Sequence, residues 1–175
     1  MNQNVPITFP VRPCCDHEIA LLADIERDAF LTLRDAGGID GEPVASDALL
    51  LERSLADGLL FVATNENDQP VGFIAATEVD GELYIEELDV LRAVQGRGIG
   101  ARLMHVMIDR AAKRALHCIT LTTDRLVPFN APFYEKLGFS ILESGDLSAH
   151  LRDRLSVQIA HGLDPQRRVA MALAF

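Results

Sequence analysis

Three glycines in five residues are the first feature of this sequence that could do chemistry. Residues 95–101 read QGRGIGA, and an apolar helical pattern follows them directly. Glycine has no Cβ, so such a turn can bring its backbone N–H groups close to a ligand. The free N–H groups and the positive dipole end of the following helix favour an anion there. The turn therefore predicts a binding site for a phosphate group.

The turn alone leaves the identity of the phosphate ligand open. Residues 96–101 also satisfy the dinucleotide pattern G-x-G-x-x-A, and Asp124 follows a strand-like segment at about the distance where that pattern places an acid. A third interpretation is that the glycines serve only close packing between a strand and a helix. The positive charges of Arg97 and Arg102 beside the turn favour a ligand over packing alone.

Two motifs together resemble the GCN5-related N-acetyltransferase (GNAT) family. Residues 95–100 match its Q/R-x-x-G-x-G/A signature, and the L-D-V triplet at 88–90 is similar to the end of its central strand. Residues 130–139, NAPFYEKLGF, resemble its second signature, a short helix that carries a tyrosine. The motifs stand in the family's order and at its usual separation. The chain is identified as a bacterial-type member, with a clear resemblance over residues 59–139.

This resemblance implies acetyl-CoA as the co-substrate, with its pyrophosphate held by the glycine turn. The central strand would offer free backbone groups to the pantetheine arm. Asn130 could donate to a pantetheine or phosphate oxygen, or could serve only as a helix cap. The expected cofactor-binding residues are Leu88, Asp89, Val90, Gln95, Gly96, Arg97, Gly98, Ile99, Gly100, Ala101 and Asn130.

Acetyl transfer to an amine needs a base for the ammonium group and an acid for the leaving thiolate. Family members with a base on the central strand commonly place it two or four residues before the L-x-V triplet, where this chain has Glu86 and Tyr84. We therefore favour Glu86, with Glu87 as the alternative because a β-bulge could exchange which glutamate faces the site. Tyr134 is the candidate acid, since a phenol of pKa near ~10 stays protonated at neutral pH. The simpler interpretations are solvated or ion-paired glutamates and a packing tyrosine.

The expected function is transfer of an acetyl group from acetyl-CoA to a primary amine. Direct attack in a ternary complex is expected, because no cysteine lies in a motif that would contact the acetyl group. The net charge of −10 favours a small cationic amine as the acceptor. The alternatives are a non-catalytic acyl-CoA-binding sensor or interaction module, and a dinucleotide-binding protein. The five histidines have no ligand spacing, so no metal is expected.

Hydrophobic periodicity gives the elements that must position these residues. Strands over 59–64, 71–76 and 83–91 form an antiparallel meander before the glycine turn, which argues against the parallel array of a dinucleotide fold. After a helix to Ala111, the strand over 118–123 should run parallel to the central one. The remaining expected elements are an edge strand over 5–11, helices capped by Asp16 and Ser46, a short helix from Asn130, a strand over 139–142, a helix over 147–160 and a last strand over 168–175.

The fold class implied by the resemblance is α/β (α+β), with a mixed, mostly antiparallel sheet that is flanked by helices and splayed between the central and following strands. A chain of 175 residues with 49% hydrophobic and 24% charged residues fits one globular domain over 1–175. Cytoplasmic location is expected, because no signal-peptide pattern opens the sequence and the three cysteines are odd in number. The expected partners are the amine and at most a second copy in a homodimer. Nucleic acid and membranes are not expected.

Overall fold

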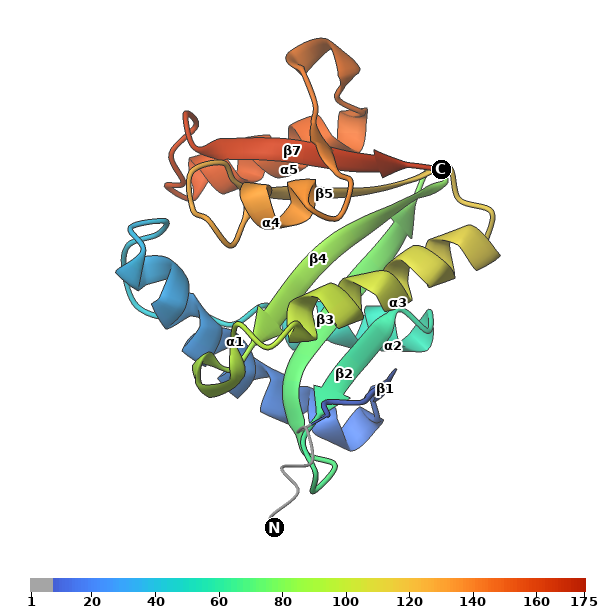
Figure 1. The fold of residues 1–175 in the computed structure, drawn as a ribbon. Coiled ribbons are helices and arrows are strands. Elements are labelled where there is room, and N and C mark those ends of the chain that lie inside the picture. Colours follow the sequence, from blue (N-terminus) through green and yellow to red (C-terminus); the bar gives the residue numbers. More distant parts are fainter. Residues whose placement is uncertain (1–7) are drawn as a thin grey trace.

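The computed structural model describes residues 8–175, and a seven-stranded sheet in the order β1-β2-β3-β4-β5-β7-β6 forms its centre (Figure 1). The strands are β1 (Val11–Pro13), β2 (Leu60–Thr64), β3 (Pro70–Val79), β4 (Glu82–Val90), β5 (Cys118–Asp124), β6 (Ser140–Ile141) and β7 (Arg168–Ala174). The helices are α1 (Ile19–Asp35), α2 (Ala48–Ala56), α3 (Ile99–Lys113), α4 (Ala131–Glu135) and α5 (Ala149–Ala160), with 3₁₀ turns η1 (Asp16–Glu18), η2 (Arg92–Val94) and η3 (Ser144–Asp146).

The sheet is antiparallel except where β4 meets β5. Strands β2, β3 and β4 form the expected meander, and β5 runs parallel to β4 because α3 connects them. Parallel pairing covers only the register from Glu82↔Cys118 to Tyr84↔Thr120. Within residues 8–175, no later residue of β4 pairs with β5, so the two strands diverge toward the end of β4. The mixed, splayed sheet confirms the expected fold class.

Helices cover both faces of this sheet. Helices α3 and α4 lie on one face, and α1, α2 and α5 lie on the other (Figure 1). Helix α3 forms because its apolar residues recur at three- and four-residue spacing, and the side chains on that stripe are fully buried: Leu103, Met104, Met107 and Ala111. Burial of each long side chain contributes about 1.5–3 kcal/mol. The helix that begins at the glycine turn is therefore firmly anchored.

A β-bulge in β4 sets the direction of its side chains. Ala75 of β3 pairs with Glu87 and Ala76 pairs with Ile85, so Glu86 is the extra residue. Before the bulge, Leu83 and Ile85 pack toward α3, and after it Leu88 and Val90 do so. The residues that face α3 are thus odd-numbered before the bulge and even-numbered after it. As a result, Glu86 and Glu87 both leave the strand on the face that carries α1, α2 and α5.

Some local expectations need correction. Residues 5–7 of the strand expected over 5–11 lie outside the described residues, residues 8–10 are not in a strand, and the edge strand β1 begins only at Val11. Asp16 does not cap α1, which follows the turn η1 and begins at Ile19. Ser46 does not cap α2 either, because Asp47 is the N-cap and its carboxylate accepts from the N–H of Leu49 at 3.0 Å. Among the helices of residues 8–175, none has the length and apolar content of a membrane span.

Candidate functional site

A cavity of about 670 Å³ opens beside the diverging end of β4. It passes from α1 on one face of the sheet to α3 and α4 on the other. Its polar lining comes from α1, β4, the glycine turn and α4: Glu26, Thr32, Glu87, Asp89, Gln95, Asn130 and Tyr134. Its volume lies within the range of ~300–1,000 Å³ that is usual for small-molecule sites.

The glycine turn forms one wall of this cavity. Gly96 and Gly98 have φ angles of +75° and +76°, a backbone conformation that residues other than glycine rarely adopt. A Cβ at either position would meet no atom of residues 8–175 within 4 Å, so both face open space. In the described chain no side chain caps the first turn of α3. Its N–H groups therefore remain free for an anion.

Gln95 fixes the turn in place. Its side-chain Nε2 donates to the carbonyl of Val90 at 2.8 Å, and its Oε1 accepts from the hydroxyl of Thr32 at 3.1 Å. These bonds connect the turn to the end of β4 and to α1. The side chain of Gln95 thus positions the backbone groups that face the cavity.

The structure brings together every expected cofactor residue except one. Arg97 is exposed and does not line the cavity, whereas its neighbours Gly96 and Gly98 do. Asn130 lies at the N-cap position of α4, yet among the described residues its side chain makes no capping hydrogen bond. The amide of Asn130 is therefore available to a ligand in the cavity.

A hydroxyl group joins two carboxyl groups on the α1 side of the cavity. The Oγ of Ser46 lies 2.8 Å from Oε1 of Glu26 and 2.6 Å from Oε1 of Glu87. The N–H of Ser46 also donates to both carboxylate oxygens of Glu26, at 2.8 and 2.9 Å. One hydroxyl has one hydrogen to donate, so the second carboxyl contact requires a proton on a carboxyl group. Glu26 and Glu87 therefore hold one proton between them.

Burial and mutual repulsion explain why this proton stays. Burial, followed by the charge of Glu26, raises the pKa of Glu87 to about 8. Burial likewise raises the pKa of Glu26. The pKa of Asp89 is raised well above its usual value by burial and by the charges of Glu87 and Glu26. Its inaccessible Oδ2 has no hydrogen-bond partner among residues 8–175. This wall of the cavity is short of positive charge and of hydrogen-bond donors.

Glu86, the glutamate that the sequence favoured, does not line this cavity. Its carboxylate accepts from Thr77 at 2.7 Å and from Arg154 of α5 at 2.5 Å, and its side chain is only 3% exposed. The expectation took Glu86 from the family's usual position, two residues before the L-x-V triplet, and kept Glu87 as the alternative in case of a β-bulge; the bulge at Glu86 is present, and it places Glu87 on the cavity. Glu87 is the glutamate that faces the site.

Tyr134 lies on the opposite side of the cavity from the glutamates. Its ring packs edge-on against Phe133 and Phe139, with centroid distances of 5.0 and 5.8 Å. Within the described chain its hydroxyl has no hydrogen-bond partner, and the residue lines the cavity. Burial, followed by the charges of Asp89 and Glu87, raises the pKa of Tyr134. The phenol is therefore held in its protonated form.

Two residues of this site, Glu26 and Ser46, were not identified from the sequence. Glu26 lies in the polar part of an amphipathic helix, and Ser46 was interpreted as a helix cap. A signal was available for Ser46, because Ser46 and Asp47 are adjacent cap-type residues and only one of them can cap the helix. No comparable signal distinguishes Glu26 from the other acidic residues of its helix.

The carboxylate of Asp124, the acid of the dinucleotide pattern, already accepts hydrogen bonds from other residues of the chain. Its side chain is 3% exposed and accepts from Arg167 at 2.7 Å. Its other oxygen accepts from the N–H groups of Leu126 and Val127 at 2.7 and 3.0 Å. A ribose hydroxyl would have to displace these bonds.

Comparison with known proteins gives a family and a fold. The family model "Acetyltransferase (GNAT) family" matches residues 21–139. The N-acetyltransferase PaiA of Thermoplasma acidophilum, solved with coenzyme A, has a TM-score of 0.71 at 16% identity, and the match covers 96% of this chain and 99% of PaiA. Naa50 of Arabidopsis thaliana, solved with the bisubstrate analogue CoA-Ac-MVNAL, has a TM-score of 0.68 at 20% identity, with 96% and 99% covered.

A longer protein also contains this fold. N-acetylglutamate synthase of Neisseria gonorrhoeae, solved with coenzyme A and N-acetyl-glutamate, has a TM-score of 0.69 at 15% identity. The match covers 98% of this chain but only 36% of that synthase. At these identities the likenesses concern the fold, and the acceptor must be argued from the cavity itself.

Proposed function

This chain belongs to the GNAT acetyltransferase family, and on that premise we propose that it transfers an acetyl group from acetyl-CoA to a primary amine. One observation carries the proposal. A single cavity joins an uncapped helix start at Gly98 to a buried carboxyl group at Glu87, with the phenol of Tyr134 across from it. An anion site, a base and an acid are the groups that this reaction needs.

Acetyl-CoA would enter from the side of α3 and α4. The free N–H groups after Gly98 suit its pyrophosphate, and the unpaired edge of β4 at Leu88 and Val90 suits the amide groups of its pantetheine arm. The amide of Asn130 offers a further hydrogen bond. This placement puts the thioester near the point where β4 and β5 separate.

The amine would approach from the side of α1. There its ammonium form meets Glu26, Glu87 and Asp89, whose pKa values are raised by burial and, for Glu87 and Asp89, by the neighbouring carboxylates. Ionised Glu87 takes a proton from the ammonium group, and the nitrogen lone pair then attacks the thioester carbonyl carbon. The hydroxyl of Ser46 holds Glu87 in place, and it connects Glu87 to Glu26, with which Glu87 shares a proton.

Tyr134 completes the reaction as the general acid. When the tetrahedral intermediate collapses, the C–S bond breaks and its electron pair goes to sulfur. The phenol donates its proton to that sulfur, and CoA leaves as the thiol. The nitrogen gives up its second proton to solvent as the amide forms, and the tyrosinate takes a proton back from solvent. The raised pKa of Tyr134 ensures that the proton is present at neutral pH.

The acceptor mouth suits a compact amine with an apolar body. Around the acidic wall the cavity is lined by Ala29, Phe30, Leu33, Val44 and Phe129. Val44 and Phe129 are 70% and 44% exposed, so apolar surface is offered at the rim as well as inside. We propose a small primary amine, and the free amino end of a protein is the competing acceptor class.

The decisive experiment pairs CoA binding with turnover. Calorimetry should show 1:1 binding of acetyl-CoA, and free-thiol release with a panel of small amines and peptides should show acetyl transfer. Gly98→Ala should weaken acetyl-CoA binding, because a Cβ at this position enters the open space beside the free N–H groups and the φ of +76° disfavours alanine. Gly162→Ala is the matched control, since Gly162 also has a positive φ (+98°) and open surroundings but lies outside the cavity.

Each outcome distinguishes one alternative. Binding without turnover on any amine would indicate an acyl-CoA sensor. Turnover on peptides alone would replace the small amine by a protein acceptor. Equal acetyl-CoA affinity in the two glycine variants would show that the glycine turn is not part of the binding site. Binding of NAD in place of acetyl-CoA would contradict the proposal.

A further inference from the structure

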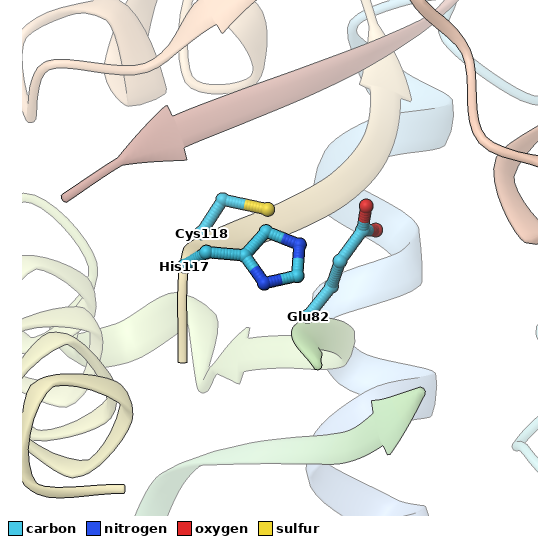
Figure 2. Close-up of side chains that lie close together, drawn as sticks. All are labelled: Glu82, His117 and Cys118. Carbon is cyan, nitrogen blue, oxygen red and sulfur yellow. The ribbon is translucent and has the colours of Figure 1, made fainter. Parts of the chain in front are cut away.

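Three metal-ligating side chains meet at the end of β4 opposite the cavity. Glu82, His117 and Cys118 each offer one ligand atom, and these atoms lie within 4.8 Å of one another. Figure 2 shows the imidazole ring of His117 between the thiol of Cys118 and the carboxylate of Glu82. Glu82 lies about 16 Å along the strand from Glu87, at ~3.3 Å per residue. The cluster is thus separate from the acetyl-transfer site.

The parallel register explains how residues so distant in sequence come together. Glu82 begins β4, Cys118 begins β5, and the two are paired across the sheet. Paired residues of adjacent strands place their side chains on the same face. The sequence offered no sign of this site, because the spacing between Glu82 and His117 matches no metal motif.

The backbone holds His117 in position beside this pair. Its N–H donates to the carbonyl of Gly81 at 3.3 Å, and its carbonyl accepts from the N–H of Phe175 at 3.1 Å. A Cβ on Gly81 would come within 2.9 Å of the imidazole Cε1. The glycine of the β3–β4 turn therefore leaves the space that the ring occupies. The hydroxyl of Thr120 lies 3.4 Å from Oε2 of Glu82 and provides an outer contact to the carboxylate.

We propose that Glu82, His117 and Cys118 form a Zn²⁺ site with three protein ligands and one open position. A thiolate, an imidazole and a carboxylate are the donors that Zn²⁺ accepts, whereas Mg²⁺ and Ca²⁺ prefer oxygen ligands alone. Ligands around a tetrahedral Zn²⁺ stand roughly 3.3–3.8 Å apart, given bonds of about 2.0–2.3 Å. Side-chain rotations that bring the three ligand atoms about 1 Å closer together would complete the site around the ion. His117 is exposed and gives the ion access from solvent.

Bound Zn²⁺ would join β4 to β5 at the closed end of the split. These strands are connected by the short register from Glu82 to Tyr84, and the ion would add a bond between its first pair. Stability should therefore depend on Zn²⁺. Acetyl-CoA affinity should be independent of the cluster, because the cavity lies at the other end of β4.

The test uses full-length, tag-free protein with its thiols kept reduced by a phosphine. Zn²⁺ titrated against a chromophoric chelator should bind 1:1, and Co²⁺ should produce a thiolate-to-metal charge-transfer band in the near ultraviolet. Cys118→Ser should abolish that band and weaken Zn²⁺ binding beyond the ~10–100-fold that loss of an outer-shell partner costs. His117→Asn and Glu82→Gln should each weaken binding. Cys15→Ser, at an exposed cysteine outside the cluster, should bind like wild type.

Thermal stability and acetyl-CoA affinity distinguish loss of the Zn²⁺ site from misfolding of a variant. Zn²⁺ should raise the Tm of wild type and not that of Cys118→Ser, while Mg²⁺ should change neither. Unchanged acetyl-CoA affinity in Cys118→Ser would show that this variant is folded. Wild-type Zn²⁺ affinity in Cys118→Ser, loss of the band in Cys15→Ser, or failure of wild type to bind below millimolar Zn²⁺ would overturn the proposal.

Discussion

Ser46 Oγ lies 2.6 Å from Oε1 of Glu87, and this contact joins the segment before α2 to the bulged central strand. Because the same Oγ lies 2.8 Å from Glu26, the carboxyl group of Glu87 cannot be considered alone.

Replacing Glu87 by Gln should lower kcat/KM by about 10²–10⁴-fold, the usual effect of losing a general base. In wild type, kcat/KM should rise with pH as Glu87 ionises and level off above about 8. The variant should instead keep rising until the amine itself loses its proton, near ~10.4 for a lysine-like amine. The deficit should therefore be largest below pH 8 and shrink above it.

Glu86→Gln is the matched control for this experiment. It removes the same charge one residue away and weakens the contacts with Arg154 and Thr77. Its pH profile should keep the wild-type shape and move to lower pH, because the charge of Glu86 raises the pKa of Glu87. A pH-dependent loss in Glu86→Gln, with none in Glu87→Gln, would restore the glutamate that the sequence favoured as the base.

The same Glu87→Gln variant should be more stable than wild type in alkaline solution. Folding raises the pKa of Glu87 from 4.5 to about 8, so the folded state binds more protons than the unfolded state between these values. Stability contributed by this group therefore falls as pH rises through that window. Glutamine removes the fall, so between pH 4 and pH 9 the variant should gain up to about 5 kcal/mol of stability relative to wild type. Thermal unfolding at pH 4 and pH 9 tests this, and an equal Tm difference at both would contradict it.

Substitutions at Glu26 and Ser46 should move the pH profile in opposite directions. The charge of Glu26 raises the pKa of Glu87, so Glu26→Gln should move the rise in kcat/KM to lower pH. The hydrogen bond from Ser46 lowers that pKa, so Ser46→Ala should move the rise to higher pH. The charges of Glu86 and Arg168 act on Glu87 in both variants alike. Shifts of the same sign would show that the two residues act only on folding.

Replacing Tyr134 by Phe should lower kcat by about 10²–10⁴-fold across the neutral range while acetyl-CoA affinity stays constant. Phenylalanine keeps the ring packing against Phe133 and Phe139, so the fold should be preserved. Tyr84→Phe is the control at the chain's other tyrosine. It removes a 3.0 Å hydrogen bond to Thr122 and should cost about 0.5–1.5 kcal/mol of stability with kcat unchanged. Equal kcat values in Tyr134→Phe and wild type would exclude the acid role.

Local chemistry made the glycine turn and the short α4 helix predictable. Positive φ angles at Gly96 and Gly98 need glycine, and an apolar stripe at helical spacing needs a core to pack on, so the residue types report the geometry directly. The short connections between β2, β3 and β4 predict the antiparallel meander, and the helical connection between β4 and β5 predicts their parallel pairing. These parts of the fold were read correctly from the sequence.

The orientation of the glutamates could not be obtained in this way. Whether Glu86 or Glu87 enters the cavity depends on one extra residue between two strands, and that is a property of the pairing with Ala75 and Ala76. Ser46 was misassigned because a serine before a helix usually caps it, and here Asp47 does so instead. Contacts between distant segments decided both cases.

Deleting the single codon for Glu86 would leave every other side chain of β4 on its present face. The bulge adds one residue to an otherwise regular alternation, so without it Ile85, Glu87 and Leu88 would still point to alternate sides. Loss of one codon on either side of the bulge would instead exchange the faces of the residues beyond it, and would turn buried side chains into the cavity or into solvent. Position 86 is thus where this strand can change its length in evolution or by engineering, at the cost of the contact with Arg154.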